Sequence, residues 1–407
     1  MRPTRLLTPF CLCLPLLASP LVQASQEDFN QCVARIEQKA VSQGVSADTA
    51  REVLAQVEHI DRVIELDRRQ PEFTTTFADY LNRRVNDARV QRGRDMLQTH
   101  RELLARVHRE TGIPPAYLVS FWGLETNFGS FFGRMSVPSS LATLACDPRR
   151  STYFTGELIS ALKIIDEGAI PLTQMEGSWA GAMGHMQFMP SVFLRYAVDA
   201  DGDGRRDLWN SIPDAMMSAG NFLNSMGWDS DYRWGREVLL PDGFDYALAD
   251  GTRRSLQAWR ALGITDVFGH PVADIDLQAR LIVPAGHRGP AFLVYHNFNV
   301  IMGWNRSEFY AIAVGHLADR IAGAGQLHTP PPEDHRPLAR DDIKALQQAL
   351  NARGFDSGSA DGVMGPATRN AVRRYQHDAG MIADGYPDGR VFQSLGIELG
   401  ASQSSSS

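Results

Sequence analysis

One glutamate in this sequence lies in a setting that could support acid catalysis. Residues 112–129 read GIPPAYLVSFWGLETNFG, in which two prolines precede an almost entirely apolar run and Gly129 follows it. This pattern is typical of a helix, and a helix that is apolar on all sides is a buried one. Glu125 follows Leu118 by seven residues and Trp122 by three, so its carboxyl group should leave the helix on the face that they cover.

This position should make Glu125 hard to ionise. Burial disfavours its charged form, and the partial negative charge at the nearby helix C-terminus disfavours it further. A carboxylic acid that stays protonated near neutral pH can give its proton to a glycosidic oxygen as that bond breaks. The alternative is a buried glutamate that is neutralised by an arginine such as Arg149 or Arg150.

A second group of residues has the spacing of calcium ligands. The segment DADGDGRRDLWN places Asp199, Asp201 and Asp203 at the first, third and fifth positions of a calcium loop, with a glycine at the sixth. Arg205 would contribute its backbone carbonyl, but the twelfth residue is Asn210 where a glutamate is usual. We expect a structural Ca²⁺ site, since hard oxygen ligands do not supply an acid. The alternative is a solvated Asp-Gly turn.

The elements that must position these residues are mostly helices. Apolar residues recur at helical spacing over residues 28–55, and a second helical stretch is expected over residues 73–108. Further helices are predicted over residues 115–128, 156–168, 191–198, 213–226, 256–262 and 306–322. The best strand candidates are residues 237–240, 281–283 and 292–294. We therefore expect a mainly α fold with a minor β part.

The chain should form one large and one small domain, because 407 residues exceed the size at which one hydrophobic core usually stops growing. Residues 324–337 contain a proline run, which favours an extended, poorly packed connector. It would separate a large domain, residues 25–323, from a small one, residues 338–399, which contains the helical runs LQQAL and TRNAVRRYQ. A serine-rich tail, residues 400–407, follows.

The first residues are typical of an export signal. Two arginines, an apolar run and a small-residue cleavage site before Ser25 predict a signal peptide over residues 1–24. An uncleaved membrane anchor is the alternative, but prolines interrupt a run that is already short for a span, and no second apolar run is long enough to cross a bilayer. Cys32 and Cys146 lie outside this signal, and in an exported protein a disulfide and two free thiols are both compatible with them.

The charge balance excludes some partners. The formal net charge is −7 at pH 7, and loss of Arg2 and Arg5 with the signal would remove two positive charges. Such a chain has no basic footprint for nucleic acid or for anionic lipid. We expect a monomer whose partner is an uncharged or mixed-charge polymer.

Several segments together resemble the lytic murein transglycosylase B family. They run in order from about residue 26 to residue 321: DRRQPEF (67–73), GLETNFG (123–129), SLATLACDPRR (140–150), GSWAGAMGHMQFMPS (177–191) and VYHNFNVIMGWNRSEFYAIAVGHLADRI (294–321). The resemblance implies a lysozyme-like catalytic domain. It also implies that Glu125, the glutamate of the family's GxET motif, is the sole acid and base.

The implied reaction needs one carboxyl group. Glu125 would protonate the oxygen that leaves C1 of N-acetylmuramic acid, breaking the β-1,4 bond to N-acetylglucosamine. It would then deprotonate the C6 hydroxyl of the same sugar, which leaves a 1,6-anhydromuramoyl end. An ordinary glycosidase needs a second carboxylate, and Glu157, Asp166 and Glu176 lie in no comparably apolar setting.

The resemblance also implies further site residues. Ser178 matches a residue that supports the catalytic glutamate, and Asp214 matches one that closes the calcium site. Residues that match positions lining the glycan site are Arg150, Tyr153, Gln187, Asn305 and Tyr310. For aromatic residues such as Tyr153, Trp179 and Trp304, core packing is the alternative.

The small domain resembles the peptidoglycan-binding domain of the first type, a three-helix unit. The resemblance rests on LQQALNARGF, DGVMGPATRNAVRRYQ and the dipeptide DG at residues 384–385. It would hold the enzyme on the wall polymer and raise the local substrate concentration. The expectation is thus a periplasmic enzyme that acts on peptidoglycan glycan strands. A lysozyme-like muramidase and a non-catalytic peptidoglycan-binding protein remain the alternatives.

Overall fold

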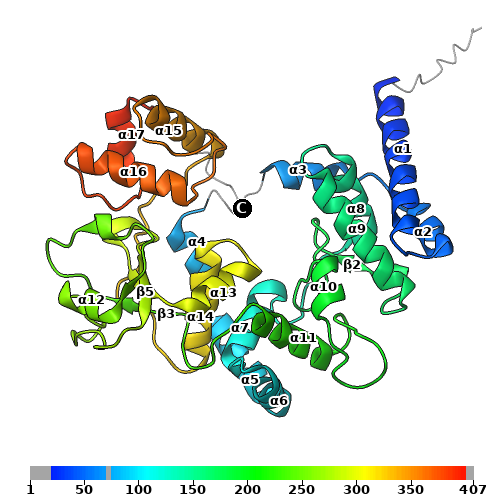
Figure 1. Ribbon diagram of the computed structural model, residues 1–407, viewed down its shortest axis with the longest axis horizontal. Helices are drawn as coiled ribbons and strands as arrows, with labels where there is room; N and C mark the ends of the chain where they lie inside the picture. The colour runs from blue at the N-terminus through cyan, green and yellow to red at the C-terminus, as the bar shows by residue number, and fades with distance from the viewer. Residues whose placement is uncertain (1–19, 70–74, 400–407) are drawn as a thin grey trace, which may run out of the picture.

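The computed structural model describes residues 20–69 and 75–399 (Figure 1). Most of the predicted signal peptide, part of the DRRQPEF segment and the serine-rich tail therefore lie outside the described residues. Within the described ranges, no helix is both long enough and apolar enough to cross a membrane. The described chain is mainly helical with short strands, which confirms the predicted fold class.

The elements of the larger part run in the following order. They are α1 (Pro20–Ser42), α2 (Ala47–Leu54), α3 (Asp61–Arg69), α4 (Phe77–Arg84), α5 (Asp87–Thr99), α6 (Arg101–Thr111), α7 (Pro115–Thr126), β1 (Met135–Ser136), α8 (Val137–Cys146), α9 (Ser151–Asp166), β2 (Glu176–Gly177), α10 (Pro190–Tyr196), α11 (Ile212–Ser225), β3 (Gly235–Val238), β4 (Arg254–Ser255), α12 (Leu256–Ala261), β5 (Gln278–Ile282), β6 (Ala291–Val294), α13 (His296–Trp304) and α14 (Glu308–Ile321). The C-terminal part contains α15 (Arg340–Ala352), α16 (Pro366–Asp378) and α17 (Gly389–Leu395).

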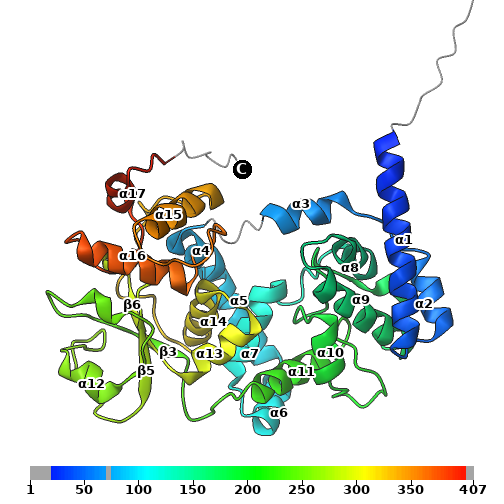
Figure 2. The same ribbon diagram turned by 45° about the horizontal axis from the view of Figure 1, so that its top comes forward.

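Apart from α12, the helices of the larger part lie in two groups (Figures 1 and 2). One contains α1, α2, α3, α8, α9 and α10, and the other contains α4 to α7, α11, α13 and α14. A single hydrophobic core runs through both groups. A disulfide between Cys32 and Cys146 joins α1 to α8 across 114 residues of sequence, so the two cysteines are paired.

The four-stranded sheet forms a separate small unit. Its strand order is β3-β6-β5-β4, all antiparallel, with Gly235 opposite Val294 and Leu281 opposite Leu293. This sheet and α12 enclose their own hydrophobic core around the buried Trp259. The larger part of the chain thus has two cores where the sequence predicted one large domain.

Two of the predicted helical stretches were wrong in their extent. Residues 28–55 divide into α1 and α2, because Gly44 adopts φ +93° and Ser46 caps α2 by accepting a hydrogen bond from the backbone N–H of Thr49. Residues 73–108 contain α4, α5 and most of α6. Asn86 caps α5, and the chain bends again at His100, whose φ and ψ are −106° and 25°. The hydrophobic periodicity did not reveal these breaks, because the capping residues can also occur inside a helix.

The C-terminal module, residues 338–399, packs against the sheet unit. Its three helices enclose a third core, and the dipeptide at residues 384–385 lies at the contact, where the carboxylate of Asp384 bonds to His287 Nδ1 at 2.6 Å and to its backbone N–H at 2.9 Å. The connector is irregular, as predicted, and none of its residues is buried, but it does make contacts with its neighbours. Arg288 binds Asp334 through both terminal nitrogens, at 2.9 and 2.7 Å, and His335 stacks on Tyr386 at 4.3 Å.

Candidate active site

The helix α7 carries Glu125 through the main core. Pro115 begins it, and nearly every residue from Tyr117 onward is buried. Asn127, Phe128 and Gly129 then adopt positive φ values of 50°, 60° and 75°, which turns the chain sharply away from the helix. The helix α7 therefore ends about half a turn beyond Glu125. Taken as a whole residue, Glu125 is partly exposed.

Two side chains from the last two helices of the larger part hold the Glu125 carboxylate. Trp304, the last residue of α13, donates from its indole Nε1 to Oε1 at 3.0 Å. The Tyr310 hydroxyl on α14 donates to the same oxygen. Because both bonds reach Oε1, Oε2 is the oxygen that is left to carry an acidic proton. The ring of Phe121 packs against both partners. Its centroid lies 4.5 Å from that of the Trp304 ring and 6.2 Å from that of the Tyr310 ring.

Burial decides the protonation of this group. Desolvation raises the pKa of Glu125 from an ordinary value of 4.5 to about 7, although the hydrogen bonds from Tyr310 and Trp304 and the charge of Arg84 act to lower it. An acid with this pKa can donate a proton near neutral pH and accept one afterwards.

The arginines that could have neutralised Glu125 are bound elsewhere. Arg149 donates to a carboxylate oxygen of Asp67 at 2.9 Å, and Arg150 pairs with the other oxygen of the same group. Asp67 lies on α3 and is buried. Arg84, whose charge acts on Glu125, donates to the backbone carbonyl of Leu124 at 3.3 Å. Glu125 is therefore not half of a buried ion pair with Arg149 or Arg150.

The other predicted residues differ in their relation to this carboxylate. Tyr310 is buried and bonds to Glu125 itself. Asn305 is exposed at the end of α13, and Tyr153 is half exposed on α9. The Gln187 amide donates to the backbone carbonyl of Phe132 at 3.1 Å. The hydroxyl of Ser178 accepts the backbone N–H of Ala182 at 3.0 Å, and the structure places no hydrogen bond between Ser178 and Glu125.

Sequence reasoning missed the role of Trp304, for which it left core packing open. The missing signal was long-range: Trp304 is 179 residues from Glu125, and no local pattern brings the two together.

Two of the three carboxylates that could have served as a second catalytic group have structural partners, and the third is exposed. Glu157 on α9 is buried and binds the start of α10, since it accepts the backbone N–H of Ser191 at 2.9 Å and its hydroxyl at 2.7 Å. Asp166 accepts the hydroxyls of Ser46 and Thr49 at the start of α2, both at 2.6 Å. Glu176 is exposed on β2.

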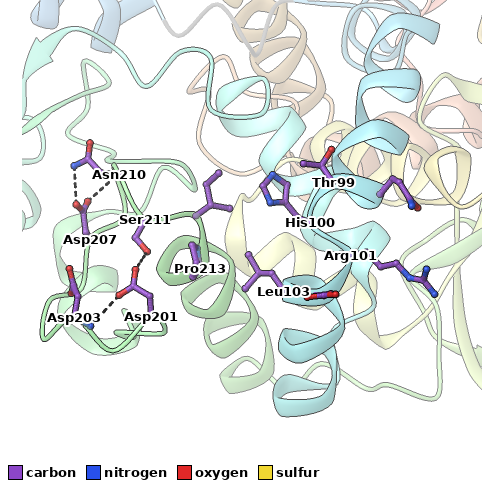
Figure 3. A pocket seen from close by; sticks show the side chains of 13 residues that line it. Thr99, His100, Arg101, Leu103, Asp201, Asp203, Asp207, Asn210, Ser211 and Pro213 are labelled. Carbon is purple, nitrogen blue, oxygen red and sulfur yellow. Dashed lines mark hydrogen bonds between the residues drawn. The ribbon is translucent and has the colours of Figure 1, made fainter.

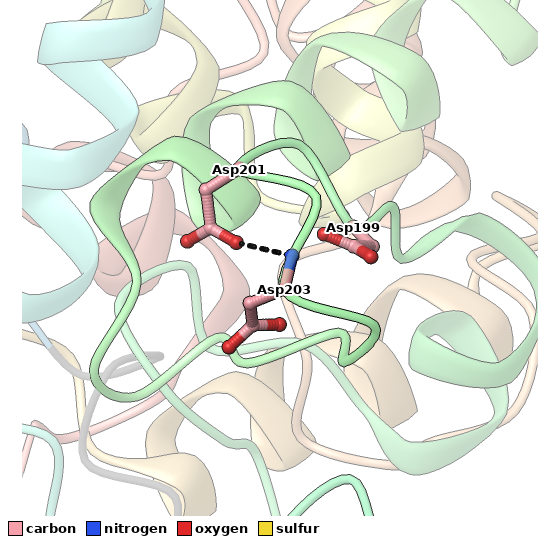
Figure 4. Close-up of side chains that lie close together, drawn as sticks. All are labelled: Asp199, Asp201 and Asp203. Atoms are coloured by element: carbon pink, nitrogen blue, oxygen red, sulfur yellow. Dashed lines mark hydrogen bonds between the residues drawn. The ribbon is translucent and has the colours of Figure 1, made fainter.

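Three of the predicted calcium ligands converge in the loop between α10 and α11, and these are Asp199, Asp201 and Asp203 (Figure 4). Asp199, Asp201 and Asp203 each offer one oxygen, and these oxygens lie within 4.8 Å of one another. The fit to a hard cation is good, because carboxylates of like charge gather here and the loop turns through glycines at φ +79° and +87°. Asp214, at the start of α11, is fully buried and accepts backbone N–H groups of the loop from Ala200 and Asp207, both at 2.8 Å.

A cavity of about 880 Å³ separates this loop from the start of α6 (Figure 3). Asp201, Asp203 and Asp207 line one side, and His100 and Arg101 line the other. Its lining does not include Glu125. We therefore do not assign the cavity to the acid.

Comparison with protein families and solved structures gives consistent matches. The model of the transglycosylase SLT domain family matches residues 28–319. A model described as a putative peptidoglycan binding domain matches residues 339–395. The chain is 31% identical over 303 residues to the membrane-bound lytic murein transglycosylase B of Escherichia coli K12, covering 70% of this chain and 81% of that protein.

Solved structures agree in fold. The crystal structure of SltB3 from Pseudomonas aeruginosa in complex with NAG-anhNAM-pentapeptide has a TM-score of 0.87 and 42% identity, over 91% of this chain and 99% of that one. The Escherichia coli lytic transglycosylase Slt35 in complex with calcium has a TM-score of 0.61 and 31% identity, over 72% of this chain and 92% of that one.

Proposed function

This chain belongs to the transglycosylase SLT domain family and is a peptidoglycan lytic transglycosylase, and from that premise we propose that Glu125 is its single catalytic acid and base. The observation that carries the proposal is the buried carboxyl group itself. Its pKa is raised to about 7, and two donors fix one of its oxygens.

The first step is proton donation. The neutral Glu125 gives its proton from Oε2 to the glycosidic oxygen that leaves C1 of N-acetylmuramic acid, and the bond to that oxygen breaks. Charge then moves onto the Glu125 carboxylate. Trp304 and Tyr310 already point their N–H and O–H groups at Oε1, so they stabilise the anion without reorganising.

The second step returns the proton. The C6 hydroxyl of the same sugar attacks the oxocarbenium-like C1, and the Glu125 carboxylate takes its proton. The result is a 1,6-anhydromuramoyl end and an acid ready for another cycle. A pKa near 7 suits both roles, because the group must be neutral before cleavage and basic after it.

The other residues that the family resemblance implied are assigned to glycan contacts. We propose that the exposed or partly exposed side chains of Tyr153, Gln187, Asn305 and Arg150 contact the sugars, with Ser178 holding the adjacent loop. Tyr faces can cover sugar rings, and amides can both donate to and accept from N-acetyl and hydroxyl groups. In this assignment Tyr310 acts on Glu125 rather than on the sugar.

We further propose a structural Ca²⁺ ion held by Asp199, Asp201, Asp203, the backbone carbonyl of Arg205 and Asp214. A bound cation would neutralise the clustered carboxylates and fix the loop. The calcium complex of Slt35 supports the assignment.

The proposed domain organisation is the one read from the sequence. A signal peptide (1–24) would direct the enzyme to the periplasm, and a catalytic domain (25–323), a connector (324–337) and a peptidoglycan-binding module (338–399) would follow. The Cys32–Cys146 disulfide supports export, and the family match over residues 339–395 supports the module.

The direct test is mass spectrometry of the soluble products that the protein releases from purified peptidoglycan. We expect anhydro products, which are lighter by one water than the products of a hydrolase. The Glu125→Gln variant should release almost none while keeping its fold, whereas the exposed Glu52→Gln variant should act like the wild type. Hydrated products would assign a muramidase, and unchanged release by Glu125→Gln would exclude Glu125 as the acid.

A further inference from the structure

The C-terminal end of α7 is hydrogen-bonded to His185, a residue that does not contact Glu125 in the proposed mechanism. His185 lies in the segment between β2 and α10 and is buried. The indole N–H of Trp122, one turn before Glu125, donates to His185 Nδ1 at 3.0 Å. The hydroxyl of Thr126 donates to the backbone carbonyl of His185 at 2.8 Å and accepts the backbone N–H of Gly129 at 3.1 Å. The residues on both sides of Glu125 are thus bonded to His185.

The packing around the imidazole leaves it little freedom. The ring of Phe132 packs edge-on against it at 4.7 Å, and Trp122 does so at 5.5 Å. A Cβ at Gly129 would lie only 2.4 Å from His185 Cε1. Glycine at 129 is therefore needed twice, for its φ of +75° and for the close approach of this ring.

The same histidine is bonded to the proposed calcium loop on its other side. Its backbone N–H donates to the carbonyl of Leu208 at 2.8 Å. Leu208 directly follows Asp207, whose own N–H binds the buried carboxylate of Asp214 at 2.8 Å. These hydrogen bonds, together with the peptide bond between Asp207 and Leu208, therefore connect the calcium loop through residue 185 to the helix that carries Glu125.

We propose that His185 is a positioning residue that holds the C-terminal end of α7, and with it Glu125, at a fixed place against the loop of residues 199–214. The inference rests on the proposed role of Glu125. Since Nδ1 must accept from Trp122, the imidazole is in the tautomer that carries its proton on Nε2. Loss of the acceptor leaves the buried indole N–H without a partner, which disfavours the present placement of the helix end.

The test separates positioning from binding and from folding. The His185→Leu variant should lose about 10- to 100-fold in kcat on a soluble glycan fragment, with KM within about twofold, because a displacement of about 1 Å at the acid costs on the order of 100-fold. The His185→Asn variant should recover most of that loss, since the amide Oδ1 can accept the Trp122 N–H. His108 is exposed, and its ring bonds at 3.1 Å to the carbonyl of Ile113, which precedes α7 at the end of the helix remote from Glu125. His108→Leu is therefore the matched control and should keep the wild-type kcat.

Each outcome decides the proposal. A wild-type kcat in His185→Leu overturns it, and so does a loss that Asn does not recover or a change confined to KM. If His185→Leu does not fold, Trp122→Phe removes the same bond from the other side and should show the same fall in kcat. An active Glu125→Gln variant would instead refute the proposed function, which keeps the two failures distinct.

Discussion

Burial of Glu125 should cost the folded protein stability whenever that group is ionised. In the unfolded chain the group has its ordinary pKa of 4.5, and in the folded state the pKa is about 7. Between these values the folded state binds more protons than the unfolded state, so the free energy of unfolding falls as pH rises through this window. At about 1.4 kcal/mol per pH unit, the full penalty is about 3 kcal/mol.

The Glu125→Gln variant should be free of this penalty. Its amide oxygen can still accept from Trp304 and Tyr310, so it reproduces the neutral acid. We expect similar unfolding free energies for the two proteins at pH 4. At pH 8 the variant should be more stable by about 3 kcal/mol.

Urea unfolding followed by tryptophan fluorescence at both pH values measures this difference, and every other titrating group cancels between the two proteins. Glu52→Gln is the control, because an exposed glutamate should give no pH-dependent difference. If the Glu125→Gln variant differs from the wild type by the same amount at pH 4 and at pH 8, the view that burial keeps this acid neutral is refuted.

Three further predictions concern activity, metal and disulfide. The kcat/KM for peptidoglycan fragments should fall about tenfold per pH unit above pH 7, since only the protonated Glu125 can start the reaction; a flat profile from pH 6 to 9 would contradict this. A chelator should lower the melting temperature by a few degrees and Ca²⁺ should restore it, an effect that Asp199→Asn should abolish and the exposed Asp242→Asn should keep. Replacing Cys32 and Cys146 by Ser should lower the free energy of unfolding by about 4 kcal/mol, because the bond closes a loop of more than 100 residues; an unchanged urea midpoint would count against that contribution.

The sequence predicted that Glu125 would be hard to ionise because the setting of this residue is local. The residues around Glu125 in α7 are apolar and buried, and the prolines and glycine that bound α7 are adjacent to them. The predicted mainly α fold was confirmed, and so was the transglycosylase function that the family resemblance implied. Asp199, Asp201 and Asp203 could be grouped for the same local reason, since alternate residues of one tight loop face one point.

What the sequence could not predict depends on contacts between distant residues. Trp304 and Tyr310 reach Glu125 only because α13 and α14 pack beside α7, and nothing near either residue indicates that partner. In the sequence, nothing distinguishes His185 from the other residues of its block, because its bond to Trp122 joins residues 63 positions apart. The division of residues 73–108 was missed for a different reason, because Asn86 can either cap a helix or lie within one.

The contact of the C-terminal module with the sheet unit bears on how the enzyme would move along its polymer. A wall-binding module on a flexible tether would let the enzyme cleave any bond within the reach of the tether. Here Asp384 is buried against His287, and the connector itself is bound through Asp334 to Arg288. In the structure the module therefore lies against the sheet unit, so a strand that it bound would start from that face of the enzyme rather than from the end of a free tether.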